Sequence, residues 1–268
     1  MTRLLPPAVC VAALLAVPLS AGAATAHHDT AQAGNVSASL TWLKTGRYQY
    51  GGIRLSIARD GTPVANRARI GDRYVQPLDV KVADLDGDGE QEVIVDLYTG
   101  GAHCCEYSRV YRYDAATGSY TNVRHMWGDP GYRLEDLDGD GRPEFVTADD
   151  AFAYRFTDYA ASGLPIQILS YSGGSFADVT RAFPAQVGED AAQWLRVYDS
   201  ARRRHGPKDL KGIAAAYVAD EYLLGDGVTA EAFLTAARES GDLGGFGGSA
   251  TRFVDRLHRF LSARGYSG

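Results

Sequence analysis

Two copies of one acidic loop that contains two glycines constrain this chain more than any other feature. The first copy is Asp84-Leu85-Asp86-Gly87-Asp88-Gly89-Glu90-Gln91-Glu92, and the second is Asp136-Leu137-Asp138-Gly139-Asp140-Gly141-Arg142-Pro143-Glu144. In both copies carboxylates occupy positions 1, 3, 5 and 9, and glycines occupy positions 4 and 6. Clustered carboxylates repel one another, and a hard cation that takes about six to eight oxygen ligands relieves that repulsion. The repeated spacing therefore predicts two calcium ions per chain.

Each predicted site uses oxygen ligands only. The first set is the side chains of Asp84, Asp86, Asp88 and Glu92 with the backbone carbonyl of Glu90. The second set is the side chains of Asp136, Asp138, Asp140 and Glu144 with the backbone carbonyl of Arg142. Position 7 can vary in sequence because only its carbonyl is needed. The glycine at position 6 permits the sharp turn that directs the odd-numbered side chains inward.

The residues that follow each loop exclude EF-hands and disfavour dockerin-type pairs. An EF-hand needs a carboxylate at position 12 and a helix on either side. Position 12 is Val95 in the first copy and Thr147 in the second. The segments 93–95 and 145–147 are β-branched or aromatic, which is typical of strands. Each loop is therefore expected to connect two strands.

In this setting the loops resemble those of FG-GAP or VCBS repeats, the blades of integrin-α-like β-propellers. The resemblance rests on Val82-x-Asp84-Leu85-Asp86-Gly87-Asp88-Gly89-x-x-Glu92-Val93-Ile94-Val95 and on its second copy, which runs from Leu134 to Val146. It covers residues 76–180, and both copies have Glu at position 9, where the family more often has Asp. A propeller of this family has about seven blades. The chain has room for two to three, which implies an incomplete propeller of antiparallel β-propeller-like blades.

Periodicity divides the rest of the chain into a β-repeat calcium-binding domain at residues 36–184 and a helical C-terminal region at residues 185–268. Residues 36–75 lack the acidic loop and are expected to form a degenerate blade. Beyond residue 185 apolar residues recur at helical spacing. The helices are expected in the segments 190–204, 210–224, 229–240 and 249–264. The predicted fold class is mainly β, followed by a small helical bundle.

The first residues predict export. In residues 1–26 a single positive charge precedes an apolar run, and Ala24-Thr25-Ala26 matches the A-x-A pattern of a signal-peptide cleavage site. Ala21-Gly22-Ala23 is an alternative site. A membrane anchor is disfavoured because three prolines lie in a segment that would need about 20 apolar residues to span. Residues 27–35 are small and polar and are expected to form a flexible leader. The sequence thus predicts a secreted, extracellular protein.

The distribution of charged residues supports the predicted metal sites and does not point to a particular binding partner. Residues 27–185 contain 15 basic and 22 acidic residues, a net charge of −7, whereas residues 186–268 contain 11 of each. Positions 1, 3, 5 and 9 of the two loops alone supply eight carboxylates. A basic surface for nucleic acid is not indicated, and no segment after residue 26 is long and apolar enough to span a membrane. The 23 arginines against four lysines indicate a GC-rich bacterial genome.

Gly100-Gly101-Ala102-His103-Cys104-Cys105-Glu106 is the other unusual stretch. Cys104 and Cys105 are the cysteines that remain after removal of the signal peptide. Because an exported protein meets an oxidising environment, a disulfide between these neighbours is favoured, and it would stiffen a turn. A free dithiol or soft-metal site with His103, and an intermolecular bridge, are the alternatives. The stretch also resembles one found in small secreted bacterial proteins of no assigned activity.

Catalytic motifs are missing from the sequence: it contains no G-x-S-x-G, no H-E-x-x-H and no P-loop. His103 and His125 are the histidines of the β region that could act as a base. The sequence favours a non-catalytic binding module over an enzyme. Its partner would be a protein or a cell-surface glycan, and open β edges would permit self-association. The alternative is a calcium-stabilised secreted hydrolase with a site near His103–Glu106.

The aromatic residues of the β region could also form a surface that stacks on sugar rings. Trp42, Tyr48, Tyr50 and Trp127 could line such a surface. Aromatic side chains in a Tyr-rich β domain more often fill the core, so these four residues are expected to be buried.

Overall fold

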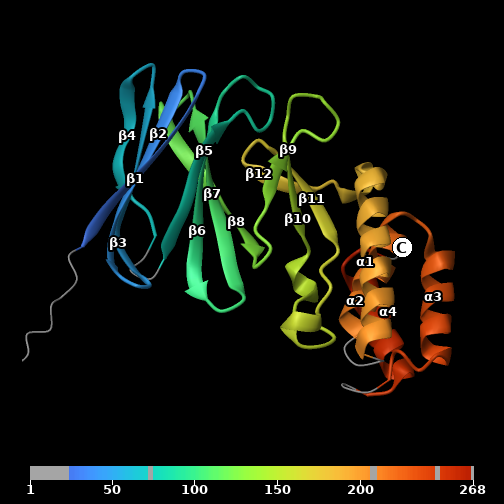
Figure 1. The fold of residues 1–268 in the computed structure, drawn as a ribbon. Coiled ribbons are helices and arrows are strands. Elements are labelled where there is room, and N and C mark those ends of the chain that lie inside the picture. Colours follow the sequence, from blue (N-terminus) through green and yellow to red (C-terminus); the bar gives the residue numbers. More distant parts are fainter. Residues whose placement is uncertain (1–23, 72–74, 206–209, 245–247, 267–268) are drawn as a thin grey trace, which may run out of the picture.

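The computed structural model describes residues 24–71, 75–205, 210–244 and 248–266. Within these residues three four-stranded antiparallel sheets precede four α-helices (Figure 1). In each sheet consecutive strands are neighbours, and the sheets are called A, B and C in chain order. The sheets and the helices stand in a row, with sheet B between sheets A and C and the helices beyond sheet C. The chain is therefore mainly β with C-terminal helices, as predicted.

Sheet A consists of β1 (Thr25–Ala33), β2 (Val36–Gly46), β3 (Gln49–Arg59) and β4 (Thr62–Arg69). The prediction of a flexible leader at residues 27–35 is wrong, because residues 27–33 belong to β1. This strand pairs with β2 from Thr25–Lys44 to Ala33–Val36. Small polar residues are compatible with this position because β1 is an edge strand with alternate residues exposed.

The predicted signal peptide, residues 1–26, lies outside the described residues except for its last three. Cleavage after Ala26 would cut within β1, whereas the alternative cleavage after Ala23 would leave this strand intact. None of the helices in the described part of the chain is both long and apolar enough to cross a membrane.

Sheet B consists of β5 (Gln76–Ala83), β6 (Glu92–Gly101), β7 (Cys104–Asp114) and β8 (Ser119–Gly128). Its strand β6 is buried on both faces, which explains its continuous apolar run. Val93 and Val95 pack in a cluster shared with sheet A, and Ile94 packs in a cluster shared with sheet C. Sheet B is thus the central layer of the β region.

Sheet C consists of β9 (Arg133–Glu135), β10 (Glu144–Ala148), β11 (Ile166–Ser172) and β12 (Ser175–Asp178). The connection between β10 and β11 contains two short 3-10 helices, η1 (Asp150–Phe152) and η2 (Tyr159–Ala161). Phe152 and Phe156 from this connection belong to the apolar cluster of the helices. The connection therefore joins sheet C to the helical region.

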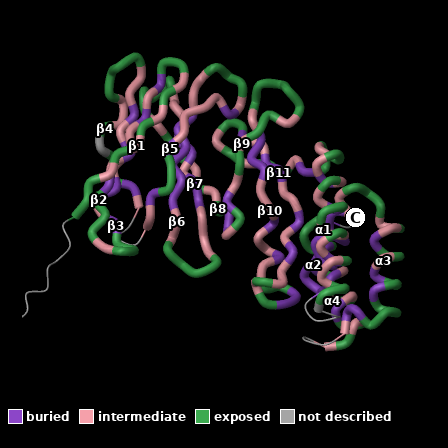
Figure 2. Tube along the Cα trace, in the orientation of Figure 1, coloured by how far each residue is buried: buried purple, intermediate pink, exposed green. Residues whose placement is uncertain are grey.

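The helices are α1 (Pro184–His205), α2 (Leu210–Leu223), α3 (Gly227–Glu239) and α4 (Ala250–Ala263), and a third 3-10 helix, η3 (Thr180–Ala182), precedes them. Helix α2 is central, with every residue from Leu210 to Asp220 buried (Figure 2). It approaches η2 so closely that a Cβ on Gly212 would lie 2.2 Å from the carbonyl oxygen of Ala161. Ser249 caps α4 as the sequence predicts, with its hydroxyl accepting from the N–H of Arg252.

The aromatic residues considered for sugar stacking do not form one surface. Trp42 and Tyr50 lie in the cluster between sheets A and B, and Trp127 lies in the cluster between sheets B and C. All three are less than a tenth exposed, as expected for core residues. Tyr48 alone is exposed, at 71%.

Candidate metal centres

Both acidic loops connect the first strand of a sheet to its second strand. The ladder between β5 and β6 ends at the pair Ala83–Glu92, and the ladder between β9 and β10 ends at Glu135–Glu144. Position 9 of each loop is therefore the first residue of the following strand. The two loops leave sheets B and C at the same edge, which is the upper edge in Figure 1.

The first loop is organised around the carboxylate of Asp84. This side chain accepts hydrogen bonds from the N–H groups of Gly87 at 2.7 Å and Gly89 at 3.0 Å. Both glycines have positive φ, at 73° and 86°. Side chains other than glycine rarely adopt this conformation, which explains the glycines at positions 4 and 6.

The second loop repeats this arrangement around Asp136. The N–H groups of Gly139 and Gly141 donate to it at 2.9 and 3.0 Å. The two glycines have φ values of 78° and 86°, close to those of the first loop. Two segments far apart in the chain thus share one backbone structure, as their common sequence pattern predicts.

The glutamates at position 9 turn back into their own loops. Glu92 accepts from the N–H of Leu85 at 3.0 Å, and Glu144 accepts from the N–H of Leu137 at 3.0 Å. Both glutamates are buried. Burial, together with the charges of the neighbouring aspartates, raises the pKa of Glu92 to about 7.

Most, but not all, of the predicted carboxylate ligands converge. Oxygens of Asp84, Asp86 and Asp88 lie within 4.8 Å of one another, as do oxygens of Asp136, Asp138 and Glu144. Glu92 and Asp140 are outside these groups. The Asp140 carboxylate instead accepts from Nε of Arg142 at 2.8 Å.

The side chain of Glu90 accepts from the guanidinium of Arg59 at 2.9 Å. The side chains at position 7, Glu90 and Arg142, are therefore engaged with protein groups. The backbone carbonyls at this position stay the predicted ligands.

The first loop contains buried oxygens that fit a cation. Oδ1 of Asp86 and Oε1 of Glu92 are buried and have no hydrogen-bond partner, and the buried hydroxyl of Tyr171 has none either. The side chain of Asp86 is 6% exposed and that of Glu92 is fully buried. Leaving buried carboxylate oxygens without a partner is costly. A donor set made only of oxygens suits a hard divalent ion such as calcium.

The two loops also contact each other and the far hairpin of sheet C. A Cβ on Gly87 would lie 2.9 Å from Cγ and Cδ of Arg142, so the second loop rests directly on the first. The N–H of Gly173, in the turn between β11 and β12, donates to Oδ2 of Asp86 at 3.1 Å. The first loop is therefore enclosed by sheet C, whereas Asp136 and Asp138 of the second loop are exposed.

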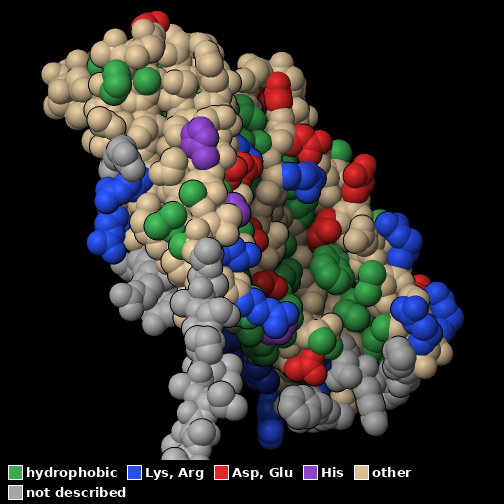
Figure 3. Space-filling model, turned by 60° about the vertical axis from the view of Figure 1, so that its left-hand side comes forward, with side chains coloured by type: hydrophobic (Ala, Val, Ile, Leu, Met, Phe, Trp, Pro, Cys, Tyr) green, Lys and Arg blue, Asp and Glu red, His purple; other side chains and the backbone are tan. Residues whose placement is uncertain are grey.

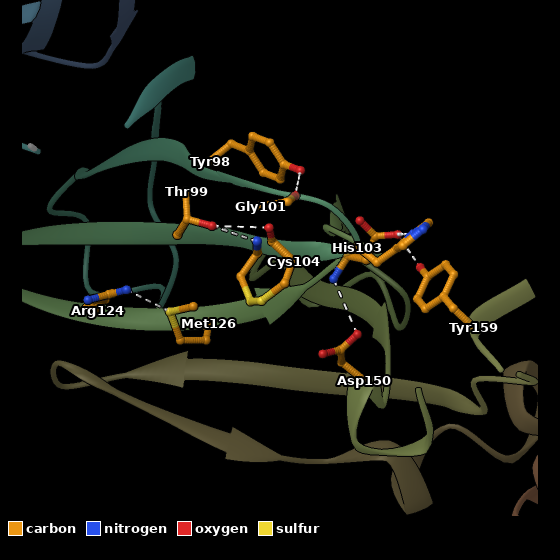
Figure 4. The surroundings of a disulfide bond; sticks show 11 residues. Tyr98, Thr99, Gly101, His103, Cys104, Arg124, Met126, Asp150 and Tyr159 are labelled. Atoms are coloured by element: carbon orange, nitrogen blue, oxygen red, sulfur yellow. Dashed lines mark hydrogen bonds and ion pairs between the residues drawn. A yellow bond between two sulfur atoms is a disulfide. The ribbon is translucent and has the colours of Figure 1, made fainter. Parts of the chain in front are cut away.

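His103 lies in the turn between β6 and β7, with a φ of 54°. Its ring stacks on Tyr159, with ring centroids 4.1 Å apart, and its Nδ1 lies 3.9 Å from Oδ2 of Asp129 (Figure 4). The Tyr159 hydroxyl donates to the same carboxylate. Neither Asp129 nor Tyr159 was expected from the sequence, because they come from other segments of the chain and carry no motif. At 3.9 Å the imidazole and Asp129 are beyond hydrogen-bonding distance.

Next to His103 the sulfur atoms of Cys104 and Cys105 are joined to each other (Figure 4). Thr99 holds this turn, because its hydroxyl accepts from the N–H of Cys105 at 2.9 Å. A disulfide between these cysteines in the natural protein stays a prediction. The second candidate base, His125, packs between Trp127 and Phe176, and burial lowers its pKa.

Comparisons with known proteins give two partial relatives. The "Probable thylakoid lumen protein sll0997" of Synechocystis sp. is 33% identical over 153 residues, which cover 55% of this chain and 44% of the relative. The "Uncharacterized protein y4bJ" of Sinorhizobium fredii is 33% identical over 91 residues, 34% of this chain and 14% of the relative. The chain thus spans less than half the length of either relative. No family model and no solved structure matches the chain.

Proposed function

We propose that this protein is an exported, calcium-binding β-repeat protein that acts by binding a partner and not by catalysis. The observation that carries the proposal is the repeated loop. Two loops with one hydrogen-bonding scheme direct carboxylates toward a common centre, and the first contains buried carboxylate oxygens without a hydrogen bond. Calcium fits these groups because it accepts oxygen ligands in flexible geometries.

We further propose that the three sheets are propeller-like blades. Each is a four-stranded antiparallel meander, and the acidic loop joins the first two strands in sheets B and C. Sheet A has only the short turn after Ala33 at this position, so it corresponds to the degenerate blade. Helices cover the outer side of sheet C in place of a further blade, which would make this an incomplete propeller.

Two observations support a location outside the cytoplasm. Residues 1–26 have the pattern of a secretory signal peptide. The relative from Synechocystis is named as a probable thylakoid lumen protein, and a lumen is reached by translocation. Calcium loops suit such a compartment, since extracellular modules function with dissociation constants as weak as about 10⁻⁴–10⁻³ M.

The outer face of sheet A is the proposed binding surface for the partner. Figure 3 shows that the upper left part of the side turned forward carries few charged side chains, whereas charged side chains are numerous on the right of the same view. A shallow groove of about 390 Å³ lies on this sheet, and Thr30, Gln32 and Ser37 are among its lining residues. Neutral side chains that both donate and accept hydrogen bonds match the hydroxyl groups of a glycan.

Calcium titration of the purified mature protein tests the metal part of the proposal. We expect two bound ions per chain and a higher melting temperature in millimolar calcium. At about 100 times the dissociation constant, each ion stabilises the folded state by about 2.7 kcal/mol. Combined Asp84→Asn and Asp136→Asn should abolish this effect, whereas Asp199→Asn, on the exposed side of α1, should leave it unchanged. A melting curve indifferent to calcium and to chelator contradicts the proposal.

The binding part is tested on a glycan array with calcium present. We expect a defined set of glycans to be bound, and Ser37→Arg, which places a charge in the groove, to remove that binding without changing the calcium titration. Binding that persists in Ser37→Arg excludes this face. Absence of binding to any glycan excludes the glycan partner.

A further inference from the structure

Both acidic loops meet an arginine, but in different ways. In the second loop the exposed side chain of Arg142 donates to the single carboxylate of Asp140, at 2.8 Å. Arg112, on β7, extends toward the first loop and donates from Nη2 to Oδ2 of Asp88 at 2.8 Å. Its Nε lies 3.8 Å from Oδ2 of Asp86 and 3.9 Å from Oε1 of Glu92. The guanidinium thus faces three of the four carboxylates predicted to bind the first ion.

Strand register explains this position. Val93 pairs with Tyr111 across β6 and β7, so Arg112, the next residue along β7, lies beside Glu92. In sheet C the corresponding pair is Phe145–Leu169. The residue that follows Leu169 is Ser170, which carries no charge. The second loop therefore has no counterpart of Arg112 at this position.

The charge of Arg112 acts on the first loop in two ways. A guanidinium stays protonated at every accessible pH, so this positive charge is permanent. Without metal it offsets part of the repulsion among the carboxylates. With metal it repels the incoming dication and competes with it for Asp86, Asp88 and Glu92. Nε of Arg112 is buried and has no hydrogen bond. The position of the guanidinium therefore depends on its attraction to these carboxylates.

We propose that Arg112 serves as a built-in cation of the first loop and makes the two calcium sites unequal. The inference rests on the calcium binding proposed above. The second loop binds calcium more tightly. The first loop binds it more weakly, because the ion must displace Arg112 from the shared carboxylates. The first loop also keeps its contact with Gly173 when calcium is scarce, because Arg112 takes over part of the ion's role.

Isothermal titration calorimetry with calcium alone tests this assignment. The wild-type protein should show two classes of site. Asp138→Asn should remove the tighter class and Asp86→Asn the weaker class. Arg112→Met keeps the apolar stem but removes the charge, and it should tighten the weaker site by about tenfold or more. Arg112→Lys keeps a charge and should leave that site weak.

Arg109→Met is the matched control, because Arg109 lies on the same strand but donates to Asn122 at 3.2 Å, away from the loop. It should leave both affinities unchanged. Melting in chelator supplies a second measurement, in which Arg112→Met should be less stable than the wild type because the carboxylates lose their compensating charge.

The outcomes separate this inference from the proposed function. Two equal sites in the wild type, or a weaker site that Arg112→Met does not tighten, overturns the role of Arg112 and leaves calcium binding in place. A wild-type protein that binds no calcium overturns the proposed function and this inference with it.

Discussion

The β region and the helical region differ in the way their charged residues are distributed. The β region is acidic, and its carboxylates concentrate in two loops at one edge of thin, stacked sheets. The helical region has equal numbers of acidic and basic residues, and its helices surround one apolar cluster centred on α2. If the loops bind calcium as proposed, dissolved ions should affect the stability of the first region more than that of the second.

The helical region nevertheless contains one buried and one half-buried acid where it meets sheet C. Asp190 of α1 accepts from the N–H of Ile166 at 2.9 Å and from Nε1 of Trp194 at 2.9 Å. Asp220 of α2 is fully buried, and neither of its carboxylate oxygens has a hydrogen bond. Burial, together with the charge of the neighbouring Asp190, raises the pKa of Asp220 to about 10. The stability of the helical region should therefore depend on pH and not on calcium.

The largest expected effect comes from the apolar cluster. Leu257 of α4 is fully buried there, and Leu257→Ala should destabilise the protein by about 2–5 kcal/mol because it removes packing and leaves a cavity. Urea unfolding followed by far-UV circular dichroism measures the loss, which should be the same in calcium and in chelator. Val228→Ala, at an 84% exposed position of α3, is the control and should change stability by less than about 0.5 kcal/mol.

A loss in Leu257→Ala that depends strongly on calcium would show that the two regions unfold as one unit. The contrast between them would then lie only in their composition and not in their energetics.

The next effect concerns Asp220 and has a defined sign. Its raised pKa means that the folded protein keeps a proton that the unfolded chain releases above a pH of about 3.9. This contribution to stability is complete below that pH and is lost as the pH rises toward about 10. Asp220→Asn cannot ionise, so at pH 7–8 it should be more stable than the wild type by about 1–2 kcal/mol, and this gain should vanish near pH 4.

The charged and titratable groups that act on Asp220 are Asp190 of α1 and Glu221 of α2, while Tyr266, after α4, senses its charge. Urea unfolding between pH 4 and 8 measures the effect, with the exposed Asp199→Asn as control. A stability difference between Asp220→Asn and the wild type that does not change with pH would remove Asp220 as the source of pH dependence.

The smallest effect is expected from Cys104 and Cys105 in the β region. A bridge between neighbouring residues closes almost no chain, so reduction should change the unfolding free energy by less than about 1 kcal/mol. Intact mass before and after reduction and alkylation should show two masked thiols that reduction exposes. Free thiols without reductant, or a covalent dimer on a non-reducing gel, would rule out this bridge.

Several features of the molecule could be predicted from sequence because they are local. The loop pattern places each Asp at position 1 within reach of the glycine N–H groups a few residues later, whatever the rest of the chain does. Ser249 before an apolar helical pattern likewise marks the start of α4. The prediction failed at residues 27–35, because a polar edge strand has no pattern of its own and depends on pairing with β2.

The sequence by itself thus determined where the carboxylates cluster, where most strands and helices after residue 35 lie, and that His103 lies beside the cysteines. Tertiary structure alone decided what faces these groups. Arg112 meets Glu92 only through the register of β6 and β7, and Asp129 meets His103 only because separate turns pack at one edge. The physical reason is that a loop is closed by hydrogen bonds within nine residues, whereas charge partners are selected by strand pairing and packing across the chain.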